Sequence, residues 1–309
     1  MKLRKGTILN DRYLIKKSFS YGGFGAVYLA QDIKKDIICA VKENLDNSHG
    51  TALSNFLREA SMLYNLRHPN LPEVWDHFVI PGEGQYLVME YIEGRSLAYI
   101  LEKNGKPLPE SKVIPWITQV CDALTYLHSQ SPPIIHRDIK PSNIRITPEG
   151  KAVLVDFGIA KFYDEFSQTS TVARAVTPGY SPLEQYGIGK TDERSDVYAL
   201  AATVYRLLTL RTPLPSVDVA AGTAETPIAA NKINPKLSNQ TSQAIQRAMR
   251  LRVKDRTHSV AQFKNELNKG MKWSSDPQYM LRRNPLYIGF ILFIVLFTVG
   301  YIAYLMRFF

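Results

Sequence analysis

Apolar and polar residues alternate in short runs along the first ninety residues, and this alternation is typical of β-strands. Three such runs lie between residues 12 and 43, and two more lie at residues 75–80 and 85–91. From Ser54 the apolar residues recur at helical spacing instead. We expect this helix to end before His68, because a residue that precedes a proline disfavours the helical conformation.

After Gly94 the apolar residues recur mainly at helical spacing, and two short strand-like runs interrupt the pattern. The helical segments are residues 113–128 and 195–210, and the strand-like runs are residues 144–147 and 152–157. We find no internal repeat. The pattern predicts an α+β fold in which a small β-rich N-lobe, about residues 1–92, precedes a larger helical C-lobe, about residues 93–268.

Residues 286–306 form a run of 21 residues without a charge. As a helix this run would be about 31 Å long, which matches the roughly 30 Å hydrocarbon core of a bilayer. A buried core helix is the alternative, but such helices are usually shorter. We therefore expect a transmembrane helix at residues 286–306, joined by a juxtamembrane linker at residues 269–285 to a folded domain at residues 1–268.

Basic residues lie unevenly around the expected transmembrane helix. Four of them lie in residues 269–285, and Arg307 follows the run. The positive-inside rule then predicts a single-pass protein of the cell membrane whose N-terminal domain is cytoplasmic. The first residues lack the apolar stretch of a signal peptide, so we expect the chain to begin at Met1.

Composition excludes several classes of protein. The net charge is +10, of which residues 269–309 contribute +4, and no basic stripe with interleaved aromatic residues indicates a nucleic-acid partner. Cys39 and Cys121 are too few for a disulfide framework or a structural zinc site. A reducing compartment is therefore expected.

A glycine-rich stretch, SFSYGGFGAVY at residues 18–28, lies between two strand-like runs. Gly22, Gly23 and Gly25 occupy three of four successive positions. Taken alone, the stretch fits a tight hairpin as well as a loop that covers phosphates.

Polar groups gather in the segment HRDIKPSN at residues 136–143, which contains Asp138, Lys140 and Asn143. Eighteen residues after Asp138, a strand-like run ends in Asp156-Phe157-Gly158. Two carboxylates and an amide suit magnesium, which prefers oxygen ligands and usually takes others from phosphates.

Two further residues are ambiguous when taken singly. Glu59 shares the inward face of its helix with Phe56 and Leu63, and a carboxylate on that face needs a cation unless it reaches solvent at the helix edge. Lys42, in the run ICAVKE, would by itself be an ordinary surface lysine.

Together these motifs resemble the protein kinase family, from about Tyr13 to Leu267. The segment TPGYSPLEQ at residues 177–185 is similar to bacterial Ser/Thr kinases, some of which also carry a membrane span behind the kinase domain. The resemblance implies a bilobal kinase fold and transfer of the γ-phosphate of ATP to protein hydroxyls, with Mg²⁺ or Mn²⁺ as the metal.

The resemblance also implies roles for individual residues. Lys42 would hold the α- and β-phosphates and be braced by Glu59. Asp138 would accept the proton of the substrate hydroxyl, and Lys140 would steady the γ-phosphate. The implied metal ligands are Asn143 and Asp156. The implied residues around the nucleotide are Ser20, Gly22, Gly23, Phe24, Gly25, Val27, Ala40, Lys42, Met89, Glu90, Ile92 and Arg145.

Three more positions resemble structural residues of the family. Glu184 is expected to pair with Arg256, and Asp196 is expected to brace the loop that carries Asp138.

Two positions depart from the family pattern. Ser20 stands where the first glycine of the loop is usual, so we expect altered nucleotide binding rather than loss of chemistry. Arg145 stands where relatives place an apolar floor under the adenine. Its guanidinium either stacks on the purine or reaches solvent and leaves Ile144 or Ile146 beneath the ring.

Two other functions remain open at this point, a nucleotide-binding pseudokinase scaffold and a small-molecule phosphotransferase of kinase-like fold. The scaffold is disfavoured by the presence of Lys42, Asp138, Asn143 and Asp156. The small-molecule enzyme is disfavoured by Lys140 and the TPGYSPLE segment. We expect autophosphorylation within a transient homodimer. Its candidate sites are in the loop after Asp156, where a phosphate could pair with Arg137, and they are Ser167, Thr169, Ser170 and Thr171.

Overall fold

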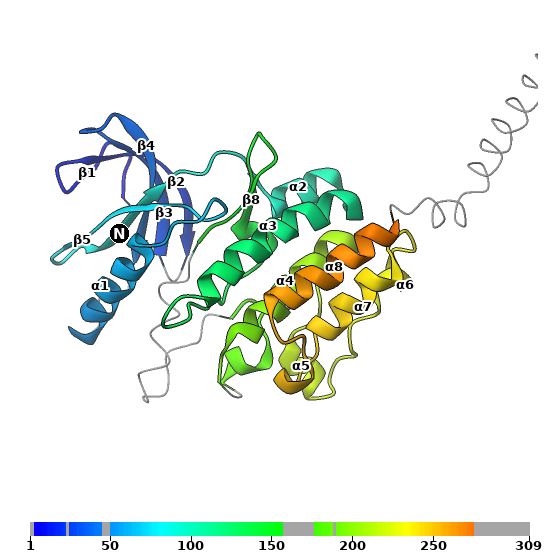
Figure 1. The fold of residues 1–309 in the computed structure, drawn as a ribbon. Coiled ribbons are helices and arrows are strands. Elements are labelled where there is room, and N and C mark those ends of the chain that lie inside the picture. Colours follow the sequence, from blue (N-terminus) through cyan, green and yellow to red (C-terminus); the bar gives the residue numbers. More distant parts are fainter. Residues whose placement is uncertain (1–2, 23–24, 45–49, 157–175, 188–189, 275–309) are drawn as a thin grey trace, which may run out of the picture.

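The chain folds into two lobes, a β-sheet with one helix against it and a bundle of helices (Figure 1). The computed structural model describes residues 3–22, 25–44, 50–156, 176–187 and 190–274. It describes the backbone but not the side chains of residues 20–22, 50–52, 54, 55, 59 and 270–274. The two lobes confirm the bilobal fold that the sequence predicted.

The N-lobe sheet is antiparallel and has the strand order β1-β2-β3-β4-β6-β5. Its strands are β1 (Ile8–Leu9), β2 (Tyr13–Gly22), β3 (Gly25–Asp32), β4 (Ile37–Asn44), β5 (Val74–Ile80) and β6 (Gly84–Glu90). The alternation in the sequence follows from the pleat, because successive side chains point to opposite faces. One face carries a core cluster with Tyr28, Cys39 and Val41, and the other carries Ala40 and Met89 toward the main core.

Helix α1 (Gly50–Tyr64) packs against β5 and β6. It begins four residues before the expected Ser54 and ends, as predicted, before His68. Phe56, Ala60 and Leu63 are buried on its inward face, which accounts for the helical spacing in the sequence.

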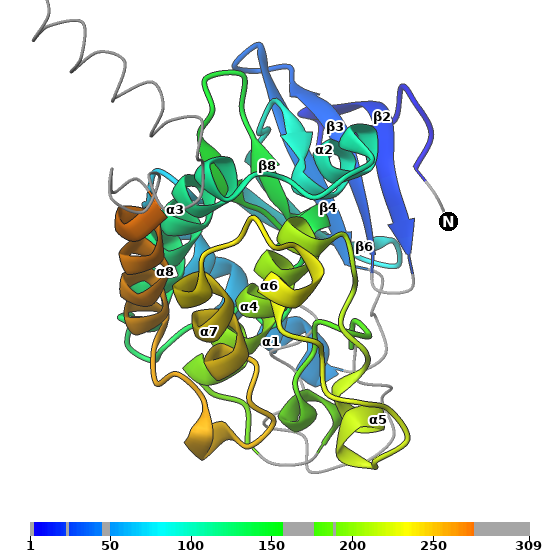
Figure 2. The same ribbon diagram turned by 90° about the vertical axis from the view of Figure 1, so that its right-hand side faces the viewer.

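The C-lobe is built around α3 (Glu110–His128) and α4 (Glu193–Thr209). Its other helices are α2 (Leu97–Asn104), α5 (Ser216–Ala220), α6 (Ala230–Ile233), α7 (Asn239–Ala248) and α8 (Val260–Ser274), with short 3₁₀ helices η1 (Pro141–Asn143), η3 (Leu183–Tyr186) and η4 (Val253–Asp255). In both ribbon views α8 lies beside α3 and α7 (Figure 2).

A second small sheet, β7-β8-β9, lies where the lobes meet. Its strands are β7 (Arg95–Ser96), β8 (Ile144–Ile146) and β9 (Ala152–Leu154). The interlobe segment, residues 91–94, runs from the end of β6 to β7. Strand β8 follows the loop after α3, and β9 ends two residues before Asp156. The small sheet therefore holds both segments beside the interlobe segment.

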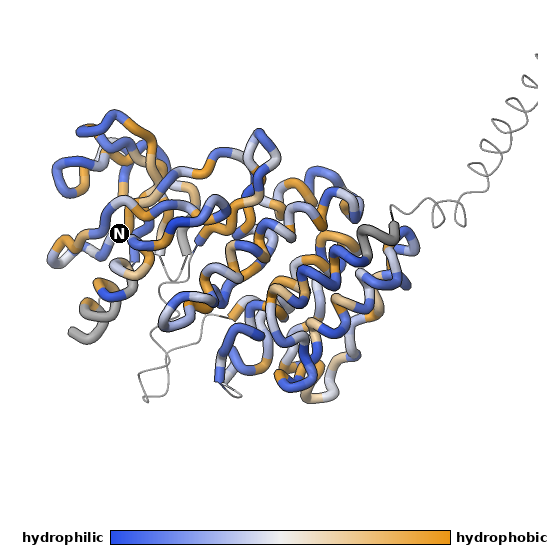
Figure 3. Tube along the Cα trace, viewed as in Figure 1, coloured by the Kyte–Doolittle hydropathy of each residue, from blue (hydrophilic) through white to orange (hydrophobic). Residues whose placement is uncertain are grey.

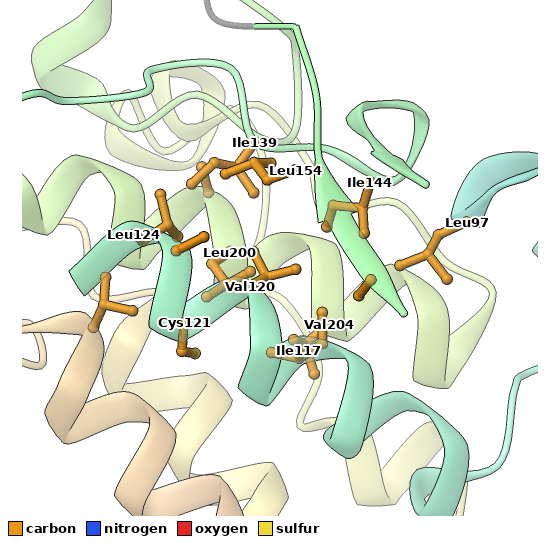
Figure 4. Close-up of a cluster of buried hydrophobic side chains, with 14 of the residues drawn as sticks. Leu97, Ile117, Val120, Cys121, Leu124, Ile139, Ile144, Leu154, Leu200 and Val204 are labelled. Atoms are coloured by element: carbon orange, nitrogen blue, oxygen red, sulfur yellow. The ribbon is translucent and has the colours of Figure 1, made fainter. Parts of the chain in front are cut away.

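Apolar side chains form two core clusters, and the larger of the two includes residues of both lobes. Hydrophobic and hydrophilic residues alternate along the helices in the hydropathy view (Figure 3), as expected for helices that bury one face. Figure 4 shows Val120 of α3 beside Leu200 of α4, and Leu154 of β9 beside Ile139, all of which are fully buried. The loops that follow α3 and β9 are thus attached to fully buried parts of the core.

The helix α8 continues through Ser274, so the first residues of the expected linker at residues 269–285 are helical. Among the residues that the structure describes, no helix is both long and apolar enough to cross a membrane. The expected transmembrane helix at residues 286–306 lies outside the described residues.

Candidate active site

The loop of residues 134–140 follows α3 and is held by a buried carboxylate of α4. Asp196 accepts hydrogen bonds from the backbone N–H groups of His136 and Arg137, each at 2.9 Å, and lies 2.8 Å from Nε2 of His128. Its side chain is fully buried, and Arg137 takes a positive φ of 65°. A non-glycine residue in this conformation needs the surrounding structure to hold it there. The predicted bracing of the loop by Asp196 is confirmed.

The charge of Asp196 is stabilised by its surroundings. Burial by itself raises the pKa of this carboxyl, but the hydrogen bond from His128 and the electrostatic interactions with His128 and His136 outweigh burial and lower the pKa. Asp196 therefore acts as an ionised acceptor for the loop.

Asp138 is oriented by three side chains. Asn143 Nδ2 donates to the Asp138 carbonyl at 2.8 Å and to its Oδ2 at 3.1 Å, and Lys140 Nζ lies 3.0 Å from the same Oδ2. Thr177 Oγ1 donates to Asp138 Oδ1 at 2.9 Å and lies 3.4 Å from Lys140 Nζ. Both carboxylate oxygens are thus fixed, as a positioned proton acceptor requires.

Thr177 is a site residue that the sequence analysis did not identify. The TPGYSPLE segment was recognised as a whole, but nothing in its pattern distinguished the first threonine as a partner of Asp138. Its hydroxyl contacts both Asp138 and Lys140, so the segment that begins at Thr177 is joined directly to the loop of residues 134–140.

An ion pair connects the two lobes. Lys42 of β4 contacts Asp156, which lies 114 positions later in the chain, just after β9. Burial tends to raise the pKa of Asp156, but the adjacent ammonium group of Lys42 outweighs it and lowers the pKa. Asp156 also has a positive φ of 65°. The side chain of Glu59 lies outside the described residues, so its pairing with Lys42 stays a prediction.

The donors at this position fit a magnesium ion bound with phosphates. Asp156 and Asn143 offer oxygens, and β9 and η1, which position them, are joined by the bond from Val155 N to Asn143 O at 2.8 Å. Within the described ranges, no group of three or more His, Cys, Asp or Glu residues could hold a metal alone. Magnesium often takes one or two protein ligands and completes its shell with phosphate oxygens and water.

The predicted nucleobase wall is assembled from neighbouring strands. Ala40 on β4 pairs with Met89 on β6, and both are almost fully buried, as is Ile92 of the interlobe segment. Val27 on β3 pairs with Lys42 on β4, so the predicted wall and Lys42 lie on adjacent strands. The strands thus bring these residues together beside Glu90, the last residue of β6.

The glycine-rich stretch forms the turn between β2 and β3. Ser20 pairs with Val27 and Gly22 with Gly25, whereas Gly23 and Phe24 lie outside the described residues. Gly25 has a φ of 147°, and a Cβ atom there would lie 2.2 Å from the carbonyl oxygen of Glu43. The sequence needs glycine at this position because Gly25, the first residue of β3, lies directly against the backbone of β4.

Arg145 has a protein partner that neither alternative for this residue included. It lies on β8, and its Nη2 donates to the carbonyl oxygen of Gly94 at 2.7 Å. Its Nε is buried and has no hydrogen-bond partner among the described residues. Ile144 and Ile146 on either side are buried. The guanidinium is therefore held at the interlobe segment, and contact with a nucleotide stays a prediction.

The segment after Thr177 is fixed by a buried ion pair. Arg256 donates to Glu184 from Nη1 at 2.6 Å and from Nη2 at 3.3 Å, and the two side chains are 0% and 2% exposed. Ser195 of α4 also donates to Glu184, at 2.7 Å. The predicted Glu184–Arg256 pair is confirmed, and Gln185 next to it donates to the carbonyl oxygen of Arg137 at 2.8 Å.

Residues 13–267 match the family described as protein kinase domain. This chain belongs to the protein kinase family. The match covers both lobes and includes each catalytic and nucleotide-site residue that the sequence predicted.

The relatives include bacterial Ser/Thr kinases. The chain is 32% identical over 274 residues to the serine/threonine-protein kinase PknB of Mycobacterium leprae, covering 84% of this chain and 43% of that protein. It is 29% identical over 271 residues to a probable serine/threonine-protein kinase of Clostridium acetobutylicum, covering 85% and 40%. The chain therefore spans less than half the length of these two relatives.

A crystal structure of the PknI kinase domain of Mycobacterium tuberculosis has the same fold. The TM-score is 0.70 at 26% identity, and the match covers 88% of this chain and all of the other. The similarity in structure extends over both lobes.

Proposed function

We propose that the chain is an active Ser/Thr protein kinase that transfers the γ-phosphate of ATP to protein hydroxyls. The observation that carries this proposal is the fixed carboxylate of Asp138, which Lys140, Asn143 and Thr177 contact from different sides. A carboxylate that is held in a fixed orientation can accept a proton from a hydroxyl within hydrogen-bond reach.

Different residues of the chain position the reacting groups and neutralise the charge of the phosphates. The ammonium group of Lys42 binds the α- and β-phosphates, and Lys140, 3.0 Å from Asp138, binds the γ-phosphate as it is transferred. Asp138 orients the acceptor hydroxyl and takes its proton. Mg²⁺ or Mn²⁺, held by Asn143 and Asp156, supplies positive charge to the phosphates when bound.

Two observations favour this function over the alternatives. The interlobe pair of Lys42 and Asp156 is formed, which a scaffold without transfer activity does not require. The segment from Thr177 to Glu184 is fixed to the core by Arg256 and to the catalytic loop by Thr177, as expected for a surface that presents a peptide. A small-molecule phosphotransferase would not need that surface.

Incubation with radiolabelled ATP and Mg²⁺ tests the proposal. We expect the purified chain to label itself and a generic basic protein on serine or threonine. Labelling of a small molecule but of no protein would support the small-molecule enzyme. Nucleotide binding without any transfer would support the pseudokinase.

Phosphorylation near Arg137 is a second expected property of the chain. Ser167, Thr169, Ser170 and Thr171 lie outside the described residues, and a phosphate on one of them could pair with the Arg137 guanidinium. We expect the variant with alanine at all four positions to lose about ten- to hundredfold in activity, since charge-assisted hydrogen bonds contribute about 1.5–3 kcal/mol.

Mass spectrometry of the active chain and a comparison of kcat between the two proteins check this expectation. Four unmodified residues in fully active protein, or full activity of the alanine variant, would contradict it.

We further propose that residues 286–306 anchor the chain in the cell membrane with the kinase domain in the cytoplasm. The proposal rests on the uncharged run and on the basic residues ahead of it. Confinement to a surface raises the local concentration of copies, which would favour phosphorylation within a transient homodimer.

We expect deletion of residues 286–309 to move the chain from the membrane fraction to the soluble fraction. Retention of the shortened chain in carbonate-washed membranes would defeat the claim.

A further inference from the structure

An aromatic pair connects strand β2 to the interlobe segment. The rings of Phe19 and Tyr91 are stacked, with centroids 5.7 Å apart and planes 3° apart. Phe19 is 45% exposed, so burial in the core does not account for its position. The contact itself holds the ring in place.

The strand order shows where these rings meet. Strands β3 and β4 lie between β2 and β6, and Tyr91 directly follows β6. With about 4.8 Å between neighbouring strands, β2 and β6 are about 14 Å apart. One face of β3 and β4 is filled by the core cluster with Tyr28 and Val41. The rings therefore meet across the other face, which carries Ala40 and Met89 of the nucleobase wall.

A β-bulge directs Phe19 toward this face. The register pairs Ser18 with Tyr28 and Ser20 with Val27, which makes Phe19 the extra residue of β2. Bulges of this kind change the direction of a side chain without ending the strand. The bulge at Phe19 thus places the ring over the nucleobase wall, just ahead of the glycine-rich stretch.

The other ring belongs to a segment that is fixed to the C-lobe. Arg145 donates to the Gly94 carbonyl oxygen at 2.7 Å. Gly94 has a φ of 117°, and a Cβ atom there would lie 2.0 Å from the carbonyl oxygen of Ile146, so the segment lies directly on β8. Tyr91 is consequently part of a backbone that is held at its far end, and Phe19 packs against a fixed ring.

We propose that Phe19 and Tyr91 form a clamp at the outer side of the nucleobase pocket that strengthens nucleotide binding. The clamp rests on the proposed kinase function. It joins β2 to the interlobe segment, and so it keeps β2 beside the outer side of the nucleobase pocket. Both rings are positioning residues, because they act on the nucleotide through the strand and the segment that they connect.

The clamp predicts a change in binding without a change in chemistry. In the full chain we expect Phe19→Ala and Tyr91→Ala each to raise the Kd for ADP and the KM for ATP about three- to tenfold, the range typical of an aromatic pair. We expect kcat to stay within about twofold, because the contact is the same in the ground state and in the transition state. The double variant should be no weaker than the weaker single variant.

Titration calorimetry with ADP and steady-state kinetics measure these effects, and two variants serve as controls. Phe19→Tyr keeps the ring and should keep the wild-type Kd. Tyr99→Ala removes a similarly exposed ring of α2, which packs on Arg95 of β7 instead, and should also bind as the wild type does.

Wild-type Kd values in both alanine variants, or effects that multiply in the double variant, would overturn the clamp. Failure of the proposed function is a separate result. A wild-type chain that binds ADP but transfers no phosphate would refute the kinase activity, and the comparison of Kd values would still decide whether the clamp exists.

Discussion

Replacing Asp138 by asparagine will lower kcat for phosphoryl transfer about 10²- to 10⁴-fold, the usual contribution of a positioned general base. Asparagine has the same shape, and its oxygen can still accept the bond from Thr177 or Asn143. The loop should therefore keep its conformation, and the loss should come from the missing proton acceptor. Initial rates with radiolabelled ATP and a protein substrate measure the effect.

Two comparisons make this result specific. The Kd for ADP should stay near the wild-type value in Asp138→Asn, since the proposed role of this carboxylate is to bind the acceptor hydroxyl and not the nucleotide. Asp122→Asn changes an exposed carboxylate of α3 that pairs with Lys264, and it should leave kcat unchanged. Transfer that survives in both Asp138→Asn and Lys42→Met would mean that the active site lies elsewhere.

Much of this site could be predicted from the sequence because its polar groups lie within short stretches. Asp138, Lys140 and Asn143 occupy one loop, and η1 brings the amide of Asn143 back to Asp138 within five positions. The strands could be predicted for a similar reason, since one buried face per strand leaves a period of two in the sequence. The first turn of α1 was missed because helix ends carry the weakest pattern.

Contacts between distant segments could not be predicted in the same way. The pairing of Phe19 with Tyr91 depends on a bulge in β2 and on how the sheet curves over the interlobe segment. The bond from Arg145 to Gly94 depends on a backbone approach that only glycine permits. Neither contact produces a periodic pattern of apolar residues in the sequence. Both can be identified only when the positions of the strands in space are known.

The Glu184–Arg256 pair also joins distant segments, and its loss should have the largest effect on stability. Arg256→Ala leaves Glu184 buried, with Ser195 as its remaining described partner, and removes donors from the carbonyl oxygens of Arg194 and Leu251. Breaking one side of a buried ion pair costs about 3–5 kcal/mol. We expect the free energy of unfolding to fall by that amount, and the melting temperature to fall by about 10 °C, in thermal and urea unfolding.

The same change should also lower kcat, because Glu184 fixes the segment whose first residue, Thr177, orients Asp138. Arg247→Ala is the matched control. Arg247 pairs with Glu266 at 3.1 Å but is 47% exposed, so its loss should cost no more than about 1 kcal/mol and leave kcat unchanged. Equal destabilisation by the two substitutions would show that burial adds nothing to the Glu184–Arg256 pair. A normal kcat in Arg256→Ala would show that Thr177 keeps its place without it.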